Sequence, residues 1–543
     1  MSTLADRTVT AETALKRLIE IGTALAAERN PDRLLEQIIV GAKELSNADG
    51  GTLYLTTEND SLRFVILRND TLGFAKGGTT GEPVQLPELP LHRPDGSPNH
   101  NNVATYAALT RKIVNINDAY HAQDFDFSGT KRFDETTGYR SQSFLTVPLC
   151  NHLGDVVGVL QLINRINPVT DKVDVFGADL VPLIEALGSQ AAMALTNQQL
   201  ILEQRNLFDA FINLMAGAID AKSPYTGGHC QRVPALTEML AAAACQETQG
   251  PFASFDLNED QWYELRVAGG LHDVGKVTTP VHIMDKATKL EKICDRIEEI
   301  RVRHEILRRD AEIAYWKGRA EGGDEAVLTA ARTARLAEID EQFAFLRQVN
   351  FGTEFTPDAA VDRIKAIAQQ TWLLEGEHRP LLLEDEVMNL SIRRGTLNAE
   401  DRKIINDHIV LTIQMLEALP FPKLLKNVPE IAGGHHEKMD GTGYPRGLKR
   451  DEMSLPARMM GIADIFEALT AADRPYKKPK PLSESIAIMA KMKQDQHIDP
   501  ELFDLFLRSG VYQDYAEKFL QPDQIDAVDI NQYLAPNFNP KGA

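Results

Sequence analysis

Histidines beside acidic residues in the second half of the chain constrain its fold more than any other feature of the sequence. His272 and Asp273 stand together in GGLHDVGKV, and His435 and His436 stand together in GGHHEKMDGTGYP. Glycines flank both pairs within otherwise helical segments. Such pairs are hard to explain by packing, although each histidine alone would be read as a structural or surface residue. The set as a whole therefore points to a ligand.

The chemistry of these pairs indicates divalent metal ions. Imidazole and carboxylate donors together suit Mn, Fe, Zn or a similar ion. An adjacent His-Asp pair offers one nitrogen and one oxygen ligand that can bridge two metals. Two metals ~3.5–4 Å apart can activate a water and stabilise the leaving oxygen of a phosphodiester. Three residues in separate motifs extend the candidate set: His229, His408 and Asp464.

Length and composition exclude several classes of protein. The 543 residues exceed one typical domain of roughly 100–200, so we expect two or three domains. No stretch approaches the ~20 apolar residues of a membrane span, and charges replace the apolar core of a signal peptide. A net charge of −20 argues against nucleic-acid binding. The sequence has no C-x-x-C pair, so we expect a cytoplasmic protein with four free thiols: Cys150, Cys230, Cys245 and Cys294.

The first half of the chain has the order of elements of an α+β domain. Apolar residues at helical spacing predict a helix over 34–45, and alternation predicts strands over 52–56 and 62–67. Two apolar runs, 144–149 and 156–164, are separated by NHLGD and predict a hairpin.

Residues 25–197 resemble the GAF family of small-molecule sensor domains. The resemblance is carried by the opening helix, by GGTLYL, by RKIVNINDAY at 111–120 and by GDVVGVLQLINR. It implies an antiparallel sheet with helices, and we assign residues 1–197 to this domain. The cyclic-nucleotide signature of the family is only partly present, so a GAF domain used for dimerisation or for an unidentified ligand is favoured. The partial matches are Lys131, Phe133, Asp134 and Glu135.

A single long helix is predicted over 187–222, and we assign residues 198–222 as the link between the two halves. Apolar residues recur every seven positions along it, as one column of a heptad would, although the companion column is poor. Two interpretations stay open: a parallel homodimer helix that passes signals between domains, or an amphipathic helix packed on its own domain. The column consists of Met193, Leu200, Leu207 and Leu214.

An insert is predicted over about 286–385. Residues 286–350 have the pattern of a helical hairpin that turns at Gly322-Gly323. The insert could cap the site, restrict substrate size or mediate assembly. Its first predicted stripe consists of Leu290, Ile293, Ile297, Ile300 and Leu307.

The second half is similar to the HD-GYP domain, a branch of the HD phosphohydrolase superfamily. HDVGK, HHEKMDGTGYP, RPYKK and HIDPEL carry the resemblance over about 205–510, and we assign residues 223–543 to this domain. It implies an all-α fold and a metal-dependent phosphodiesterase that hydrolyses cyclic di-GMP to linear pGpG, with GMP if both bonds break. The GAF domain would regulate this reaction.

The resemblance also implies the roles of individual residues. Asp273 would bridge the metals, and two Fe or Mn ions are favoured over three because Tyr225 replaces a glutamate that some members use. Lys276 would contact a phosphate or the attacking hydroxide, or else form a salt bridge with a nearby carboxylate. Tyr444 would line the substrate site, with Arg474 and Lys477 on its phosphates. The implied metal ligands are His229, His272, Asp273, His408, His435, His436 and Asp464.

Two rival functions remain at this stage. The same metal centre could hydrolyse another cyclic dinucleotide, such as cyclic GMP-AMP. Alternatively, the domain could be a silent receptor or scaffold that binds cyclic di-GMP without turnover. An intact set of seven metal ligands argues against a silent site.

Overall fold

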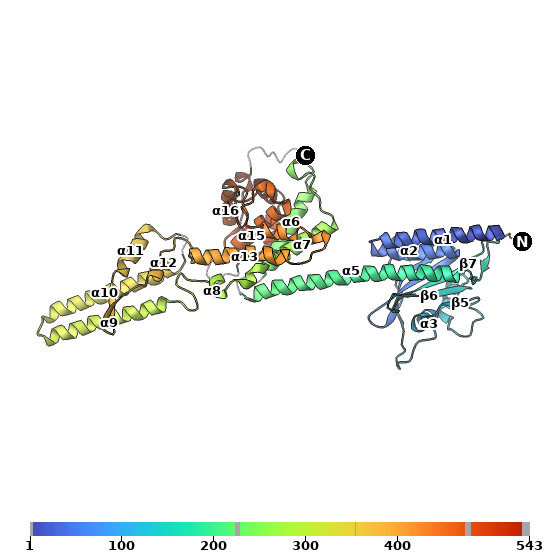
Figure 1. Ribbon diagram of the computed structural model, residues 1–543, viewed down its shortest axis with the longest axis horizontal. Helices are drawn as coiled ribbons and strands as arrows, with labels where there is room; N and C mark the ends of the chain where they lie inside the picture. Colours follow the sequence, from blue (N-terminus) through green and yellow to red (C-terminus); the bar gives the residue numbers. More distant parts are fainter. Residues whose placement is uncertain (1–3, 223–227, 353–354, 473–478, 535–543) are drawn as a thin grey trace. The chain divides into compact units, whose positions relative to one another are not determined.

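The computed structural model describes residues 4–222, 228–352, 355–472 and 479–534, with side chains from residue 12 onward. The chain divides into two compact units, Met1–Leu207 and Phe208–Ala543 (Figure 1). No helix in the described ranges is long and apolar enough to cross a bilayer. Three residues that the sequence singled out lie outside the described residues: Tyr225, Arg474 and Lys477.

The first unit is built on one antiparallel sheet, as predicted. Its strands lie in the order β3-β2-β1-β7-β6-β5, and β4 (Leu89–Pro90) and β8 (Val173–Asp174) pair with β2 and β7. The predicted hairpin is confirmed, because β6 and β7 pair from Phe144↔Ile163 to Cys150↔Val156. The main strands are β1 Ala48–Thr56, β2 Ser61–Asn69, β3 Phe74–Gly77, β5 Val114–Ile116, β6 Phe144–Cys150 and β7 Val156–Ile166.

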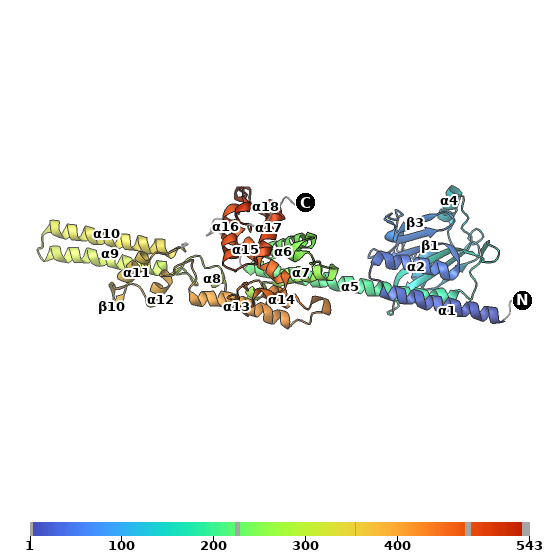
Figure 2. The same cartoon turned by 90° about the horizontal axis from the view of Figure 1, so that it is seen from above.

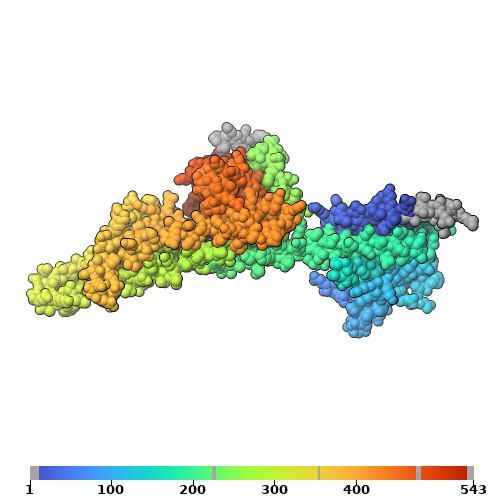
Figure 3. Space-filling model, in the orientation of Figure 1, coloured from blue at the N-terminus to red at the C-terminus, as the bar shows by residue number. Residues whose placement is uncertain are grey.

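Alternation along the central strands gives this sheet two apolar faces. Leu53 on β1 and Leu160 on β7 belong to one buried cluster, and their neighbours Tyr54 and Val159 belong to another. Helices α1 (Leu4–Ala27), α2 (Pro31–Ser46) and the start of α5 cover the first face. Helix α3 (Val103–Thr110) covers the second. Figure 3 shows the surface of α1 beside that of the N-terminal part of α5.

Helix α5 runs from Val181 to Lys222, which includes the predicted long helix. Its first turns are held by the sheet, because Ile184, Leu187 and Ala191 are buried there. The predicted apolar column, in contrast, does not pack on its own unit. Its four members, Met193, Leu200, Leu207 and Leu214, are between 52% and 73% exposed.

The second unit is a bundle of helices around one apolar core (Figures 1 and 2). Large side chains such as Leu240, Phe466 and Tyr515 fill this core. Five helices position the candidate site: α6 His229–Gln246, α7 Glu259–Leu271, α13 Ala399–Glu417, α14 Val428–Gly433 and α15 Leu455–Thr470. The C-terminal part of α5 also packs in this core, as do three further helices: α16 Leu482–Gln494, α17 Pro500–Arg508 and α18 Val511–Phe519.

The insert has its own small core and contains the predicted helical hairpin. Helices α9 (Ile297–Ala320) and α10 (Glu325–Asn350) lie side by side, and Gly322 supports the turn with a φ of 84° (Figure 2). The insert also holds α11 Asp358–Ala368, α12 Glu384–Leu390 and a two-stranded hairpin that was not predicted, β9 Thr371–Leu374 with β10 Glu377–Pro380.

The predicted apolar stripe of the insert is wrong at its start. Ile293 is 96% exposed, and the helix begins only at Ile297. The reason is a competing hydrogen bond: the Leu290 amide donates to the Asn350 side chain at 2.9 Å, which takes the backbone out of a helical path. Asp295 in turn accepts a hydrogen bond from the Asn350 amide at 2.9 Å.

Candidate metal centre

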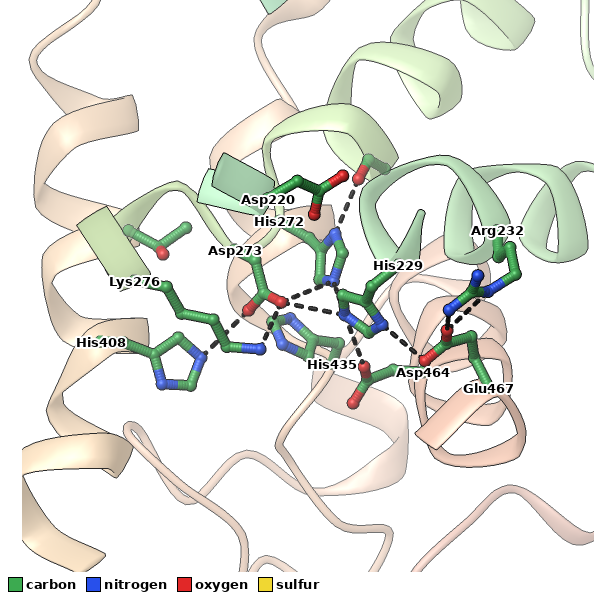
Figure 4. A network of polar contacts seen from close by, with 12 residues as sticks. Asp220, His229, Arg232, His272, Asp273, Lys276, His408, His435, Asp464 and Glu467 are labelled. Atoms are coloured by element: carbon green, nitrogen blue, oxygen red, sulfur yellow. Dashed lines mark hydrogen bonds and ion pairs between the residues drawn. The ribbon is translucent and has the colours of Figure 1, made fainter. Parts of the chain in front are cut away.

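Five segments of the second unit bring all seven predicted ligands to one place. His229 is the first residue of α6, and His272 and Asp273 follow the last turn of α7. His408 lies on α13, His435 and His436 follow α14, and Asp464 lies on α15. Figure 4 shows six of these side chains converging, with Asp273 among the histidines. Residues separated by more than two hundred positions therefore form one buried cluster.

Asp273 occupies the centre of this cluster, and each of its oxygens faces different residues. Oδ2 lies 3.0 Å from Nε2 of His229 and 3.3 Å from Nε2 of His272. Oδ1 lies 3.2 Å from Nε2 of His408. The carboxylate is 2% exposed. This is the placement that a bridging ligand requires.

The donor atoms fall into three overlapping groups, one of which consists of His272, Asp273 and His435. His229, His272 and Asp464 form one group, and His408, His435 and His436 form another, with the donor atoms of each group within 4.8 Å of one another. In the first group, Asp464 Oδ1 lies 3.5 Å from Nε2 of His229. In the second, the Nε2 atoms of His408 and His436 are 3.3 Å apart.

The hydrogen bonds of the Nδ1 atoms, the outer nitrogens of these histidine rings, show which ring nitrogens face the site. Nδ1 of His272 lies 2.7 Å from the Gly269 carbonyl, and Nδ1 of His435 lies 2.6 Å from that of Ala432. Nδ1 of His408 bonds the Ile405 carbonyl in the same way. A carbonyl only accepts, so each Nδ1 carries a proton, and in the neutral ring Nε2 presents its lone pair to the site. This is the arrangement typical of metal-ligating histidines.

Two buried acceptors at the centre have no hydrogen-bond partner in the described part of the chain. They are Nε2 of His435 and Oδ1 of Asp273. His408 Nε2 lies 3.2 Å from Asp273 Oδ1 but is not hydrogen-bonded to it. An unpaired buried polar atom costs about 1–3 kcal/mol. A cation would satisfy both atoms, so the donor set fits bound divalent metal.

The pKa values of these side chains agree with metal binding. Burial and the neighbouring His272 lower the pKa of His435 to about 4, and burial and His435 lower the pKa of His436 well below its usual value. Both rings are therefore neutral ligands at pH 7. Burial opposes the charge of Asp273, but Lys276 and His272 hold the pKa of that carboxyl well below its usual range.

His229 differs from these rings. Burial would lower its pKa, yet hydrogen bonds to Asp273 and Glu467 raise the pKa to about 9. Without metal, His229 therefore carries a proton that it shares with Asp273. Binding a metal at Nε2 displaces that proton, so metal uptake releases protons at neutral pH.

Lys276 lies one turn beyond Asp273 and forms the salt bridge that the sequence left as an alternative. Its Nζ is 2.5 Å from Asp273 Oδ2. Burial would lower the pKa of Lys276, but Asp273 and Asp464 raise it, so the side chain stays charged. The site thus keeps one fixed positive charge beside its central carboxylate.

Tyr444 forms part of the wall of the site. Its ring stacks on His436, with centroids 4.9 Å apart and an interplanar angle of 24°. Burial and Asp464 raise the pKa of Tyr444 to about 12, so its hydroxyl stays protonated. Gly443 is required beside it, since a Cβ there would lie 2.4 Å from the Lys438 amide nitrogen. Glu437 holds the same loop by accepting from the Arg446 amide at 2.8 Å.

The sequence analysis missed two residues that contact the site from behind. Glu467 accepts a hydrogen bond from His229 Nδ1 at 2.6 Å, and Arg232 pairs with the same carboxylate at 2.7 Å. Glu467 follows Asp464 by three residues on α15, and Arg232 follows His229 by three on α6. The i, i+3 spacing from a ligand was the available pattern, because such residues share a helix face.

Family models match both halves of the chain. Residues 30–195 match the GAF domain, and residues 382–502 match the HD domain. The second match contains His408, His435, His436 and Asp464, whereas His229 and His272 precede it. The chain therefore combines an N-terminal GAF domain with a C-terminal helical region that contains an HD domain.

Curated relatives match shorter stretches. A 3'3'-cGAMP-specific phosphodiesterase 3 of Vibrio cholerae is 44% identical over 112 residues, which are 20% of this chain and 23% of the relative. A probable cyclic di-GMP phosphodiesterase of the same organism is 36% identical over 137 residues, 24% of this chain and 31% of the relative. A cyclic di-GMP phosphodiesterase of Thermotoga maritima is 35% identical over 117 residues, 22% and 31%. The matches thus span less than a third of each of these relatives.

Proposed function

We propose that the second unit is a metal-dependent phosphodiesterase of the HD-GYP type and that its substrate is cyclic di-GMP. The observation that carries the proposal is the central Asp273, which is buried and has each oxygen turned toward different histidines. A two-metal phosphodiesterase needs such a bridge. The names of the relatives point to cyclic dinucleotides as the substrate class.

Each group of donors would hold one ion. His229, His272 and Asp464 would bind the first, and His408, His435 and His436 the second, with Asp273 shared. Two bound Fe or Mn ions would supply Lewis acidity and lower the pKa of water towards neutrality. One water is consumed for each P–O bond broken, so the first cleavage gives linear pGpG and a second would give GMP.

Other residues of the chain would bind and orient the substrate. The Lys276 ammonium carries the fixed positive charge at the site, so it is suited to a phosphate oxygen as well as to Asp273. The Tyr444 ring would line the substrate site beside His436. Arg474 and Lys477, outside the described residues, are proposed phosphate contacts because Arg forks onto phosphate and Lys supplies a point charge.

A second candidate substrate is 3'3'-cGAMP. A relative with that specificity is 44% identical over its matched stretch. Both dinucleotides present the same phosphodiester to the metals and differ only in one base. The two must therefore be compared in one assay.

We also propose that the protein is a cytoplasmic homodimer in which the GAF domain binds an unidentified small ligand and regulates hydrolysis. Four exposed apolar side chains at heptad spacing on α5 support a parallel helix pair. All four cysteines are free, as expected in a reducing compartment. Replacing Leu200 and Leu207 by Glu should convert a two-chain mass in light scattering to one chain, whereas Ile313→Glu, on the insert, should not.

The function is tested by incubating full-length protein with cyclic di-GMP or 3'3'-cGAMP, with Mn²⁺ or anaerobic Fe²⁺, and separating the products by chromatography. The test variant is His272→Ala/Asp273→Ala. The matched control is His304→Ala, because His304 is an equally buried histidine on α9 in the insert. We expect turnover by the parent and the control, and loss in the test variant.

Each outcome of this assay has a distinct meaning. The preferred dinucleotide identifies the substrate, and the product peak shows whether one or two bonds break. If a parent with bound metal cleaved neither dinucleotide, the proposed substrate assignment would be wrong.

A further inference from the structure

The four rings with a fixed outer nitrogen are not all held in the same way. His272, His408 and His435 each donate from Nδ1 to a carbonyl three residues earlier in their own segment. His229 opens its helix, and its Nδ1 donates instead to Glu467, which belongs to a different helix, α15. One ring of the cluster therefore depends on a tertiary contact for its orientation.

The surroundings of Glu467 suit it to orienting the His229 ring. Its side chain is buried, with 1% of the residue exposed. One oxygen, Oε2, lies 2.6 Å from His229 Nδ1, and the other, Oε1, lies 2.8 Å from Nε of Arg232. It belongs to none of the groups whose donor atoms could hold a metal. A buried carboxylate is costly unless paired and hydrogen-bonded, and both oxygens of Glu467 are used in this way.

We propose that Glu467, held by Arg232, is a positioning residue that fixes the tautomer and ring plane of His229 and so sets the metal affinity of the His229/His272/Asp464 group. The inference rests on the proposed metal centre but not on its substrate. Glu467 contacts His229 and not the His408/His435/His436 group. That group therefore keeps its metal affinity when Glu467 is changed.

The hydrogen-bond chemistry makes the proposal specific. A carboxylate only accepts, so Glu467 requires a proton on Nδ1 of His229, and the proton that metal displaces is then the one on Nε2. A glutamine at position 467 has the same shape but one oxygen and one NH₂. Arg232 only donates, so it would take the amide oxygen and turn the NH₂ toward His229. Nδ1 would then have to accept, and Nε2 would carry a proton where the metal should bind.

This argument predicts a rescue that a purely structural role does not. In Glu467→Gln, the first group should lose Mn²⁺ affinity by roughly 10–100-fold, the range for lost outer-shell partners. Adding Arg232→Met should free the amide to rotate and offer its oxygen to His229, which restores affinity. Glu467→Asp keeps an acceptor-only group and should retain most of it.

The experiment is a Mn²⁺ titration of the full-length protein, in which binding is monitored by calorimetry and by the electron paramagnetic resonance signal of free Mn²⁺. The control is Glu264→Gln, because Glu264 is a buried carboxylate on α7 that accepts from the Asn427 amide at 2.7 Å and touches no ligand. We expect two ions on the parent and control, one tight ion on Glu467→Gln, and two again on the double variant.

Three results would overturn the inference. The first is parent-like binding of both ions by a folded Glu467→Gln protein. The second is equal weakening of both ions, with no recovery in the double variant. The third is a parent that binds no Mn²⁺, which would remove the metal centre as well. A parent that binds Mn²⁺ but cleaves no dinucleotide would defeat only the proposed function, because this titration does not use turnover.

Discussion

The Asp134 network of the GAF unit and the metal centre of the second unit each bury a carboxylate, with opposite results. In the GAF unit, Asp134 is buried but accepts from the Tyr120 hydroxyl at 2.7 Å and from the amide and hydroxyl of Ser141 at 2.8 Å. In the metal centre, Asp273 Oδ1 and His435 Nε2 have no partner among the described residues. The Asp134 network is satisfied by its own chain, whereas a cation would satisfy the two unpaired atoms of the metal centre.

The residues of the partial cyclic-nucleotide signature differ in their surroundings within the GAF unit. Of its four residues only Asp134 is buried, and it bonds its own chain. Phe133 is exposed, and Lys131 lies over the Tyr120 ring at 5.4 Å. Aromatic contacts such as Tyr54 on Phe64, at 4.6 Å between centroids, fill the face of the sheet under α3.

The largest expected effect comes from removing metal. Calorimetry of the full chain should resolve two transitions, and a chelator should lower only that of the second unit. An ion present at a thousand times its Kd stabilises the folded state by about 4 kcal/mol. Equal shifts in both transitions, or no shift at all, would contradict the contrast between the two interiors.

The next effect concerns the Asp134 network of the GAF unit. Asp134→Ala should destabilise the GAF unit by about 3 kcal/mol, because it leaves three donors from Tyr120 and Ser141 without their acceptor. The variant also assigns the GAF transition in calorimetry. Asp124→Ala, an exposed neighbour, is the control and should change stability by less than about 0.5 kcal/mol. A similar loss in both variants would mean that the network is not the cause.

A third variant tests whether the loss of stability depends on the hydrogen bonds of a buried carboxylate rather than on the unit in which the carboxylate lies. Asp499 lies in the same unit as the metal centre but is fully paired: it caps α17 and accepts from Arg450 at 2.9 Å. Asp499→Ala should cost about 2 kcal/mol at pH 7 in urea unfolding. Stability close to that of the parent would contradict this account.

The same variant has a predictable pH dependence. Burial opposes the charge of Asp499, but Arg450 and the Leu502 amide lower the pKa of its carboxyl below 3.8. A depressed carboxyl pKa adds stability above the unfolded value, and this stability is lost as the pH falls through the folded value. The difference between parent and variant should therefore shrink below about pH 4. A constant difference down to pH 2 would exclude the charge as its source.

The sequence predicted the parts of the molecule that depend on local patterns. Alternation predicted the strand over 52–56, two apolar runs separated by NHLGD predicted the β6–β7 hairpin, and the adjacent pairs in HDVGK and GGHHEK marked the candidate site. The seven proposed ligands were predicted because each lies in a recognisable motif, and two of these motifs hold an adjacent pair. Glu467 and Arg232 were missed because their role depends on contacts between α6 and α15, which the sequence does not show. The start of α9 was placed too early because Asn350, sixty residues away, captures the Leu290 amide.

The smallest expected effect makes the sharpest comparison. His435→Leu removes a buried acceptor that has no partner in the described chain, at the cost of one hydrogen bond to the Ala432 carbonyl. The two terms are each about 1–2 kcal/mol and opposite in sign, so the metal-free stability should change by less than about 1 kcal/mol. Metal binding by the His408/His435/His436 group should fall sharply in the same protein. A metal-free loss as large as that of Asp134→Ala would show instead that His435 serves the fold, and that the two interiors are alike.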